Sequence, residues 1–262
     1  MRNYLWLYLR LVGFSIRAQM EYRASFLLQT AANLLITCIE FVAIWAVLGR
    51  FGNIRGWTLP EICFFYGTAN AAFAIGEAIS RGFDQFAGFV RGGDFDRILL
   101  RPCPTVVQLL GHELSLRRSG RLAQALTVIS LGFAWMPQTF TLSNVALLAW
   151  AISCGALLFT GVLIIQATIC FWTTESIEMM NVLTYGAVFS SQYPLSIYRD
   201  WFRNFFTFVI PLAGVVFLPV LGVLGRSSGW HVWLAPLCGP IFLLAALQIW
   251  RFGVRRYCST GT

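Results

Sequence analysis

The sequence predicts an all-α integral membrane protein, and two observations carry this prediction. The chain of 262 residues is 58% apolar and only 11% charged, with a mean hydropathy of +0.69. Soluble domains carry about 25% charged residues, so this chain must expose most of its surface to lipid. Apolar runs of about 20 residues, the length that crosses a bilayer as a helix, also recur along the chain. We therefore expect a single transmembrane domain over residues 1–262, built as a six-helix bundle.

Residues 1–22 precede the first long apolar run and predict an amphipathic helix. The apolar residues that share one face at helical spacing are Leu5, Leu9, Val12, Ile16 and Met20. The charged residues lie near another face. A helix of this kind rests in the inner membrane interface rather than crossing the bilayer. The alternative is a frayed cytoplasmic tail.

Six apolar runs are expected to cross the membrane. They cover residues 25–48, 59–80, 120–136, 144–172, 177–197 and 231–250. The stretch 198–226 is also apolar, but Pro194, Pro211 and Pro219 interrupt it, and proline kinks or ends a helix. This stretch fits either a re-entrant pair of short helices or the fifth span. Both alternatives keep an even number of crossings.

The distribution of arginine orients the bundle. With both termini in the cytoplasm, the inner segments contain 14 of the 19 basic residues and the outer segments contain 5. Cytoplasmic loops of membrane proteins carry the excess of basic residues, so this orientation is predicted. A seventh span would move the last three arginines to the outer side, which favours six.

The most polar stretch of the chain, residues 92–104, lies in the predicted inner loop 81–119. Two glycines end the preceding helix, Asp94 is placed to cap a new one, and two prolines stop it after about two turns. The apolar side chains that share one face of this short helix are Phe95, Ile98 and Leu99. A capped amphipathic helix favours a docking surface for a partner. An ordinary loop packed on its own bundle explains the pattern equally well.

No catalytic site and no metal site is predicted. The chain contains no lysine, which a phosphate-binding P-loop requires. Its seven cysteines form no CxxC pair and only two histidines are present, so the usual zinc and His-based catalytic patterns are missing. The GxSxG pattern at residues 225–229 lies between membrane segments, without the strand-to-helix turn that creates a nucleophile. The arginines at 117–121 indicate the inner membrane surface rather than a nucleic-acid site.

Polar side chains recur on one face of three predicted spans. They are Gln29, Asn33, Thr37 and Glu40 in the first span, Tyr66, Asn70 and Glu77 in the second, and Glu178, Asn181 and Tyr185 in the fifth. Ionisable groups at membrane depth face the bundle interior or a cavity, so one hypothesis is that these stripes line a translocation path. The alternative is interhelical hydrogen bonding, worth about 0.6 kcal/mol per contact.

The balance between these alternatives differs from residue to residue. Because such hydrogen bonds are common between membrane helices, hydrogen bonding is favoured for Asn33, Thr37, Asn70 and Asn181. For Glu40 the translocation path is favoured, because a carboxylate at mid-span costs about 2.5–3.5 kcal/mol on insertion scales. Glu77 lies near the inner end of its span and has the alternative of reaching toward water.

The loop segment also resembles a known family. The pattern G-x-h-D-x-h-L-h-R-P is met by Gly93, Asp96, Leu99, Arg101 and Pro102. Together with the amphipathic first helix, the six spans and the proline-interrupted stretch, it resembles the permease subunits of type-two ABC transporters, and most closely a branch of short drug or multidrug exporters. The resemblance covers nearly the whole chain. It implies re-entrant helices before the last span and export across the bacterial cytoplasmic membrane.

The resemblance further implies how the chain is driven. The segment between the second and third spans would be the coupling helix, which docks onto two separate ATPase subunits that bind ATP and Mg²⁺, so this chain would need no cofactor and would not itself be an enzyme. The residues expected at the contact are Asp94, Phe95, Asp96, Arg97, Leu99, Arg101 and Pro102. Asp96 and Arg101 are expected to make the docking contacts, and Phe95 and Leu99 are expected to form an apolar ridge.

The expected function is that of a permease subunit of an ATP-driven exporter. It would form the translocation path with a second permease, identical or paralogous, and would carry a drug-like, amphipathic or lipid-like substrate through the lipid membrane. The alternative is a secondary transporter or channel that works without an ATPase. Inverted repeats or a paired acid relay would favour that alternative, and neither is visible in the sequence.

Overall fold

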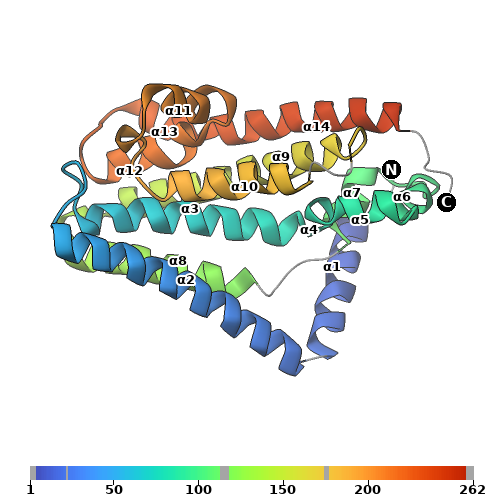
Figure 1. Cartoon of the computed structure of the whole chain (residues 1–262), viewed down its shortest axis with the longest axis horizontal. Coiled ribbons are helices and arrows are strands. Elements are labelled where there is room, and N and C mark those ends of the chain that lie inside the picture. The colour runs from blue at the N-terminus through green and yellow to red at the C-terminus, as the bar shows by residue number, and fades with distance from the viewer. Residues whose placement is uncertain (1–3, 22, 113–117, 174–176, 258–262) are drawn as a thin grey trace.

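The computed structural model describes residues 4–21, 23–112, 118–173 and 177–257 of the chain. These residues form helices joined by short connections, and no β-strand occurs in the ranges described. Figure 1 shows most of the long helices running side by side, with α1 (Tyr4–Glu21) crossing them at one end. The all-α prediction is confirmed for this part of the chain.

The helices follow the predicted order of elements. The other long helices are α2 (Arg23–Phe51), α3 (Leu59–Ile79), α8 (Ser119–Trp135), α9 (Leu142–Ile169), α10 (Ile177–Ser191) and α14 (Cys238–Arg256). The short helices after α3 are α4 (Arg81–Asp84), α5 (Phe86–Arg91), α6 (Asp94–Leu99) and α7 (Thr105–Leu110). The segments before α14 are η3 (Leu195–Ile197), α11 (Asp200–Asn204), η4 (Phe205–Val209), η5 (Ala213–Phe217), α12 (Leu218–Val223), α13 (Trp230–Leu234) and η6 (Ala235–Leu237), while η2 (Pro137–Thr139) joins α8 to α9.

The predicted number of six crossings is not confirmed by the helix lengths. In the described ranges, the segments long and apolar enough to cross a membrane are Ala24–Phe51, Leu59–Ile79, Leu142–Ile169 and Trp230–Arg256. Helices α8 and α10 have 17 and 15 residues, fewer than the roughly 20 that a bilayer core requires. The predicted run 177–197 continues beyond the end of α10 into the connection that follows, whereas the predicted run 120–136 nearly coincides with α8 and is itself short.

The proline-interrupted stretch folds as two helical limbs with a sharp bend between them. The limbs Asp200–Val209 and Ala213–Val223 meet at 87°. Pro211 lies at the break, where its missing N–H and its ring stop the helix from continuing. Each limb contains one turn of wider π-helix, η4 and η5. The bend fits a broken span or a re-entrant hairpin, the same alternatives that the sequence presents.

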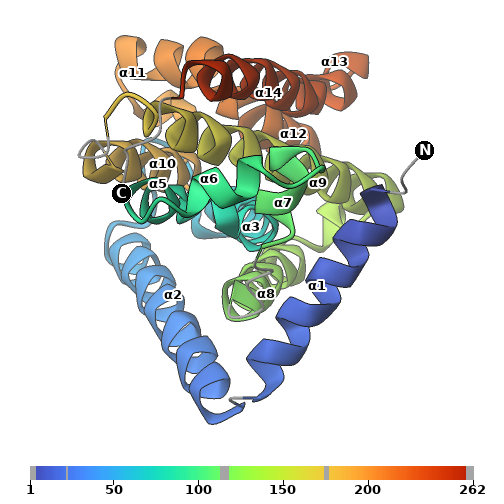
Figure 2. The same cartoon turned by 90° about the vertical axis from the view of Figure 1, so that its right-hand side faces the viewer.

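Helix α3 lies at the centre of the bundle. It packs against α8 and α9, and α9 in turn packs against α14 (Figure 2). Small residues permit these close contacts, as in other membrane bundles. A Cβ on Gly155 of α9 would lie 2.8 Å from the Cβ of Ala72, and a Cβ on Gly132 of α8 would lie 3.2 Å from the ring of Phe64. The glycines therefore set the distance between α3 and its neighbours.

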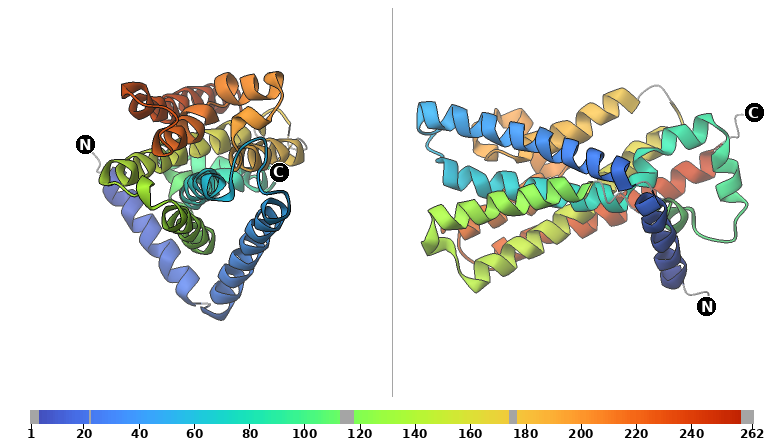
Figure 3. Two further views of the ribbon diagram at one scale, coloured as in Figure 1. Left: turned by 90° about the vertical axis from the view of Figure 1, so that its left-hand side faces the viewer. Right: turned by 90° about the horizontal axis from the view of Figure 1, so that it is seen from below.

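Helix α2 stands apart from this core. In its apolar stretch 17% of the residues are buried, against 83% in that of α3. Figures 2 and 3 show α1 and α2 running apart from each other, with α8 between them. Large apolar side chains are exposed along α2, including Leu28 (72%) and Leu35 (62%). Such a continuous apolar surface requires lipid around it, as expected of a multi-pass membrane protein.

Helices α4 to α7 pack on one end of the bundle, which is called the loop end here. The opposite end carries the connection 52–58 between α2 and α3. At the loop end, aromatic rings from three parts of the chain form a second hydrophobic cluster around Phe86, Phe95, Phe171 and Trp250. This cluster ties the short helices to the end of α14.

Candidate translocation groove and coupling segment

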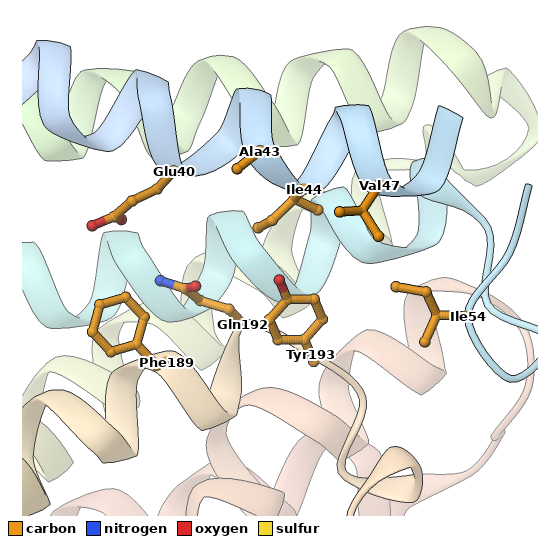
Figure 4. A pocket seen from close by; sticks show the side chains of 8 residues that line it. All are labelled: Glu40, Ala43, Ile44, Val47, Ile54, Phe189, Gln192 and Tyr193. Atoms are coloured by element: carbon orange, nitrogen blue, oxygen red, sulfur yellow. The ribbon is translucent and has the colours of Figure 1, made fainter. Parts of the chain in front are cut away.

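A groove runs between α2 and α10 and has a volume of about 310 Å³. The side chains that line it are Glu40, Ala43, Ile44, Val47, Ile54, Phe189, Gln192 and Tyr193. Figure 4 shows the α2 residues on one side and Phe189, Gln192 and Tyr193 on the other, with Ile54 closing the end near the 52–58 connection. The groove is largely apolar, and Glu40 supplies its one ionisable carboxylate.

The carboxylate of Glu40 lies at the end of the groove farther from Ile54 (Figure 4). Phe189 and Gln192 face it from α10 and from the turn that follows. Within the described residues, Glu40 makes no hydrogen bond that would hold it as part of the helix packing, and its side chain is half-buried. A negative charge beside aromatic and aliphatic surface suits a ligand with a positive group and an apolar body.

Three other residues of the predicted stripes are buried between helices instead of lining the groove. The Tyr66 hydroxyl donates a hydrogen bond of 3.1 Å to the carbonyl oxygen of Thr37. Asn70 donates its Nδ2–H to the Tyr66 carbonyl oxygen at 2.9 Å. Gln124 of α8 donates its Nε2–H groups to the Thr37 carbonyl oxygen and to the Tyr66 hydroxyl, each at 3.2 Å. Tyr66 and Gln124 therefore bond α2, α3 and α8 together, while the hydrogen bond of Asn70 stays within α3.

Sequence reasoning did not single out Gln124. Its signal was present, because Gln124 is a polar residue inside an otherwise apolar run. It lies three residues after Arg121, close to the basic inner end of the span. Only the packing of α8 between α2 and α3 shows that this amide bonds both neighbours.

Glu77 does not reach toward water, and that alternative for this residue is wrong. It is 1% exposed and its carboxylate forms an ion pair with Arg118 of the segment that enters α8. The Nη1 atom of Arg121 lies 4.0 Å from its second oxygen. Arg118 at the N-cap of α8 and Arg121 within α8 make burial tolerable, because an unpaired charge at such a position is strongly unfavourable. Sequence spacing along α3 alone does not show these partners.

The remaining stripe residues are more scattered. Gln29 is exposed on α2 and Asn33 is half-buried there. Tyr185 of α10 is half-buried, with its ring centroid 5.7 Å from that of Phe73. Glu178 and Asn181 belong to α10, but their side chains lie outside the described part of the structure.

The coupling segment, defined as residues 93–102, contains the predicted short helix as α6. The residue that caps this helix differs from the prediction, which assigned the cap to Asp94. Gly93 is the N-cap, in the left-handed region at φ 70°, where glycine is strongly favoured. Asp94 is the first helical residue, and its carboxylate pairs with Arg97 at 3.2 Å. Asp94 and Arg97 are both exposed, so this end of α6 presents a pair of opposite charges.

Phe95 and Leu99 were expected to form an exposed apolar ridge, and this expectation is wrong for Phe95. Phe95 is fully buried, and its ring centroid lies 4.9 Å from that of Phe86 and 5.0 Å from that of Tyr257. Leu99 is 40% exposed and Leu100 is 86% exposed. Phe95 belongs to the face of α6 that packs on its own bundle. The exposed apolar pair of this segment is therefore Leu99 and Leu100.

Asp96 and Arg101 lie in different surroundings. Asp96 is half-buried beside Tyr257. Burial raises the pKa of Tyr257, and the neighbouring Asp96 carboxylate raises this pKa further. Arg101 and Pro102 are exposed. Of the two residues expected to make docking contacts, Arg101 is thus open to a partner, while Asp96 already faces the end of α14.

Two hydrogen-bond donors hold the coupling segment in place. Gln108 of α7 donates its Nε2–H groups to the carbonyl oxygens of Ile98 at 3.0 Å and Cys103 at 2.8 Å. The Nε1–H of Trp250 donates to the hydroxyl of Thr105 at 3.1 Å. Thr105 is the first residue of α7 and lies outside the segment, so this hydrogen bond from α14 anchors α7, which Gln108 in turn bonds to the segment.

At the opposite end of the bundle, a single carboxylate joins three segments. Glu61, in the first turn of α3, accepts hydrogen bonds from the backbone N–H of Thr58 at 2.8 Å and from its hydroxyl at 2.9 Å. It also forms an ion pair with Arg226. The guanidinium of Arg226 lies 4.0 Å from the centroid of the Trp57 ring, and the indole N–H donates to the Ser196 hydroxyl at 3.1 Å.

In the described ranges, no three His, Cys, Asp or Glu side chains are grouped so that they could hold a metal ion.

Comparison with known proteins agrees with this architecture. The family described as ABC-2 family transporter protein matches residues 34–261, a range that includes the groove, the coupling segment and the bent pair of helices. No curated protein and no solved structure matches the chain. Because the match extends over most of the sequence and the fold is an all-α bundle with several apolar helices, the chain belongs to the ABC-2 transporter family, as a multi-pass permease subunit of an ABC transporter.

Proposed function

We propose that this permease exports amphipathic cations. The observation that carries the proposal is the Glu40 carboxylate at one end of an otherwise apolar and aromatic groove. A carboxylate attracts a cationic group strongly where water is scarce. Phe189 and Tyr193 supply aromatic surface for the same cation, and the aliphatic side chains of α2 supply surface for its apolar body.

A purely structural role for Glu40 is less well supported. Its neighbour Thr37, one turn earlier on α2, is buried and bonded to α3 and α8 through its carbonyl oxygen. Glu40 instead faces the groove. A carboxylate placed at membrane depth costs about 2.5–3.5 kcal/mol on insertion scales, and among the described residues no hydrogen bond offsets that cost. A ligand cation would offset it.

The proposed bundle crosses the bacterial inner membrane six times. Helices α8 and α10 would cross together with α2, α3, α9 and α14, since both lie alongside α3 and contact it. Their short lengths require the membrane to thin around them or neighbouring segments to fill the interface. The bent limbs Asp200–Val209 and Ala213–Val223 would re-enter from the outer side. The arginine distribution supports cytoplasmic termini.

Membership of the family supports ATPase subunits as partners. We place their docking surface on the exposed side of the coupling segment, with Asp94, Arg97, Leu99, Leu100 and Arg101. An exposed apolar pair can enter a groove on the partner, and the charges that flank the pair can fix the register of the contact. Two ATPase subunits, which bind ATP and Mg²⁺, would serve two permeases, and the second permease would be a copy or a paralogue.

The contacts inside the loop end supply a route for movement. Closure of the ATPases would push α6, and Phe95 and Trp250 would pass this movement to α14. The first turn of α14 contacts the bent limbs, where the Cys238 thiol donates to the Pro211 carbonyl oxygen at 3.4 Å. ATP binding shifts such an equilibrium only as far as its differential affinity for the two states allows.

The proposal is tested on the permease purified with its ATPase subunits and reconstituted in lipid nanodiscs. Tetraphenylphosphonium, an amphipathic cation, is expected to stimulate ATP hydrolysis, and triphenylphosphine oxide, a neutral molecule of similar character, is expected to stimulate it much less. In the Glu40→Gln variant, the concentration of cation that gives half-maximal stimulation should rise about tenfold, because one full charge is lost from the site.

The matched control is Asp200→Asn, which removes the same charge from a side chain that is 83% exposed and lies outside the groove. It should leave stimulation by the cation unchanged. Equal responses of the wild type and Glu40→Gln to tetraphenylphosphonium would refute cation binding at Glu40. Transport in vesicles that continues after ATP depletion would refute ATP-driven export and favour a secondary transporter.

A further inference from the structure

A tight turn joins the residue that closes one end of the groove to a buried tryptophan. Ile54 closes the groove near the 52–58 connection (Figure 4), and it exchanges two backbone hydrogen bonds of 3.0 Å with Trp57. The two residues between them, Arg55 and Gly56, have φ angles of 49° and 83°, as expected of the central residues of a type I′ turn. Because the turn is closed at both ends, the position of Ile54 follows that of Trp57.

The indole of Trp57 connects the two sides of the groove at this end. Its Nε1–H donates to the hydroxyl of Ser196 at 3.1 Å. Ser196 lies in η3, three positions after the groove residue Tyr193. One side of the groove end is therefore the 52–58 connection, the other is the segment that follows α10, and this hydrogen bond joins them.

A guanidinium group covers the same indole. The Cζ atom of Arg226 lies 4.0 Å from the centroid of the Trp57 ring, within the range of a cation–π contact. The ion pair with Glu61 holds the guanidinium there. Glu61 also accepts the two hydrogen bonds from Thr58, the residue after Trp57. Trp57 is thus fixed on one side by Ser196 and on the other by Arg226.

The position of Arg226 depends in turn on the bent pair of helices. The backbone N–H groups of Arg226 and Ser227 donate to the carbonyl oxygen of Leu221 at 2.9 Å and 3.2 Å. Leu221 belongs to α12, the last part of the limb Ala213–Val223. A rotation of this limb would therefore carry Arg226 away from Trp57.

We propose that Trp57, Glu61, Ser196 and Arg226, called the Trp57 latch, hold this end of the groove closed, and that a bound cation leaves here only after the latch opens. The inference rests on the proposed function, because it takes the groove as the path of the cation. Trp57 does not line the groove. It is a positioning residue, which acts through Ile54 and through the segment after α10.

The latch consists of contacts that movement of the limb can break. The side chain of Arg226 is 43% exposed, and Ser196 is exposed as well. Water can therefore take the place of each lost partner, which keeps the net strength of such contacts small. Several weak contacts acting together close the groove, yet no single one of them prevents opening.

The first experiment measures how fast tetraphenylphosphonium leaves the permease–ATPase complex in nanodiscs. Ser196→Ala and Trp57→Phe each remove the hydrogen bond between the two sides of the groove. In both variants the dissociation rate of the cation should rise about fivefold, because the net effect of one hydrogen bond corresponds to a factor of this order. Ser196→Ala changes an exposed side chain, so its midpoint of thermal unfolding should stay at the wild-type value.

The matched control is Trp150→Phe. The indole N–H of Trp150 donates to the carbonyl oxygen of Trp233 at 3.1 Å, the same length as in the latch, and Trp150 does not line the groove. Its loss should leave the dissociation rate of the cation unchanged.

The second experiment locks the latch. The double variant Trp57→Cys, Ser196→Cys is cross-linked with a short, reducible bis-thiosulfonate reagent, and each single variant is treated in the same way to control for the native cysteines. Cross-linking should abolish transport of the cation in vesicles and suppress ATP hydrolysis measured without any cation, and a reducing agent should restore both. A contact that only stabilises the fold would not hinder transport when it is reinforced.

The outcomes separate this inference from the proposed function. If Glu40→Gln weakens cation binding while Ser196→Ala and Trp57→Phe release the cation at the wild-type rate, the groove stands and the latch is overturned. Transport by the cross-linked complex at the rate of the reduced complex would overturn the latch equally. If the wild type binds no tetraphenylphosphonium, the proposed function fails. ATP hydrolysis without cation then decides on the latch, since reversible inhibition by the cross-link supports it and unchanged hydrolysis refutes it.

Discussion

At the residue scale, Glu61 shows how this bundle accommodates a carboxylate at the end of a buried helix. Glu61 is 6% exposed, yet it caps the start of α3 through Thr58 and pairs with Arg226 from a connection 165 positions later in the chain. A negative charge in the first turn also interacts favourably with the helix dipole. Both effects offset the desolvation of the carboxylate.

Removing Arg226 should weaken this end of the bundle. In Arg226→Met the Glu61 carboxylate keeps its Thr58 donors but loses its counter-charge and the contact of the guanidinium with Trp57. Because Arg226 is 43% exposed, the expected loss of stability is moderate, about 1–2 kcal/mol. A lower midpoint of thermal unfolding in detergent would show this loss.

The control for Arg226→Met is Arg203→Met. The pair of Arg203 with Asp200 is 2.8 Å long, but both side chains are largely exposed, and exposed pairs contribute only about 0–1 kcal/mol. A larger loss of thermal stability in Arg203→Met than in Arg226→Met would contradict the importance assigned to the Glu61 site.

At the element scale, the coupling segment shows which features of a helix a local sequence pattern predicts and which it does not. Glycines before it and prolines after it predict a short helix at about residues 94–101, and α6 (Asp94–Leu99) confirms that helix. The apolar pattern also identifies a face with Phe95, Ile98 and Leu99. What the pattern does not contain is which part of that face meets the bundle, because this depends on the rings of Phe86, Phe171 and Trp250.

Two alanine variants separate packing from docking in α6. Phe95→Ala removes a fully buried ring and should lower stability by about 3–5 kcal/mol. Leu100→Ala shortens a side chain that is 86% exposed and should leave stability nearly unchanged, while it weakens recovery of the ATPase subunits with the tagged permease. Thermal unfolding and quantitative co-purification are the two measurements.

The opposite pattern would contradict the assignment of faces within α6. If Leu100→Ala unfolded at a clearly lower temperature, or if Phe95→Ala kept wild-type stability and lost only the ATPase, the apolar ridge would include Phe95 after all. Helix α10 gives the second lesson at this scale, because the apolar run 177–197 predicts its existence but not its end at Ser191.

At the scale of the whole molecule, the bundle depends on close contacts between helices that are distant in the chain. Gly239, at the start of α14, lies against the backbone of α9, and a Cβ there would overlap the carbonyl oxygen of Cys154. Close approach of this kind lets membrane helices gain packing contacts that bulkier residues prevent. The position of α14, and with it the link from the coupling segment to the bent limbs, depends on this contact.

Gly239→Leu should therefore displace α14 from α9. Overpacking of this kind costs about 1–3 kcal/mol, and the expected signs are a lower unfolding temperature and loss of ATPase stimulation by the cation. Gly49→Leu is the matched control, since a Cβ on Gly49 meets nothing within 4 Å. If both variants behaved like the wild type, the α9–α14 contact would not be a determinant of the fold.

The sequence by itself determines the class of this protein and the order of its elements. Charge-poor composition requires lipid around the chain, long apolar runs require helices, and prolines and glycines mark their breaks. Sequence also identifies Glu40 as a carboxylate at mid-span, where its energetic cost favours a functional role. These properties are local, since they depend on composition and on neighbours along the chain.

Only the tertiary structure decides which polar side chains meet. The Tyr66 hydroxyl lies inward because α8 brings Gln124 between α2 and α3, and Glu77 is buried because Arg118, at the N-cap of α8, and Arg121, within α8, reach it. Phe95 faces the bundle because α14 ends beside it. These contacts join residues tens of positions apart, and their energies depend on distance and burial in space, which no spacing along one helix contains.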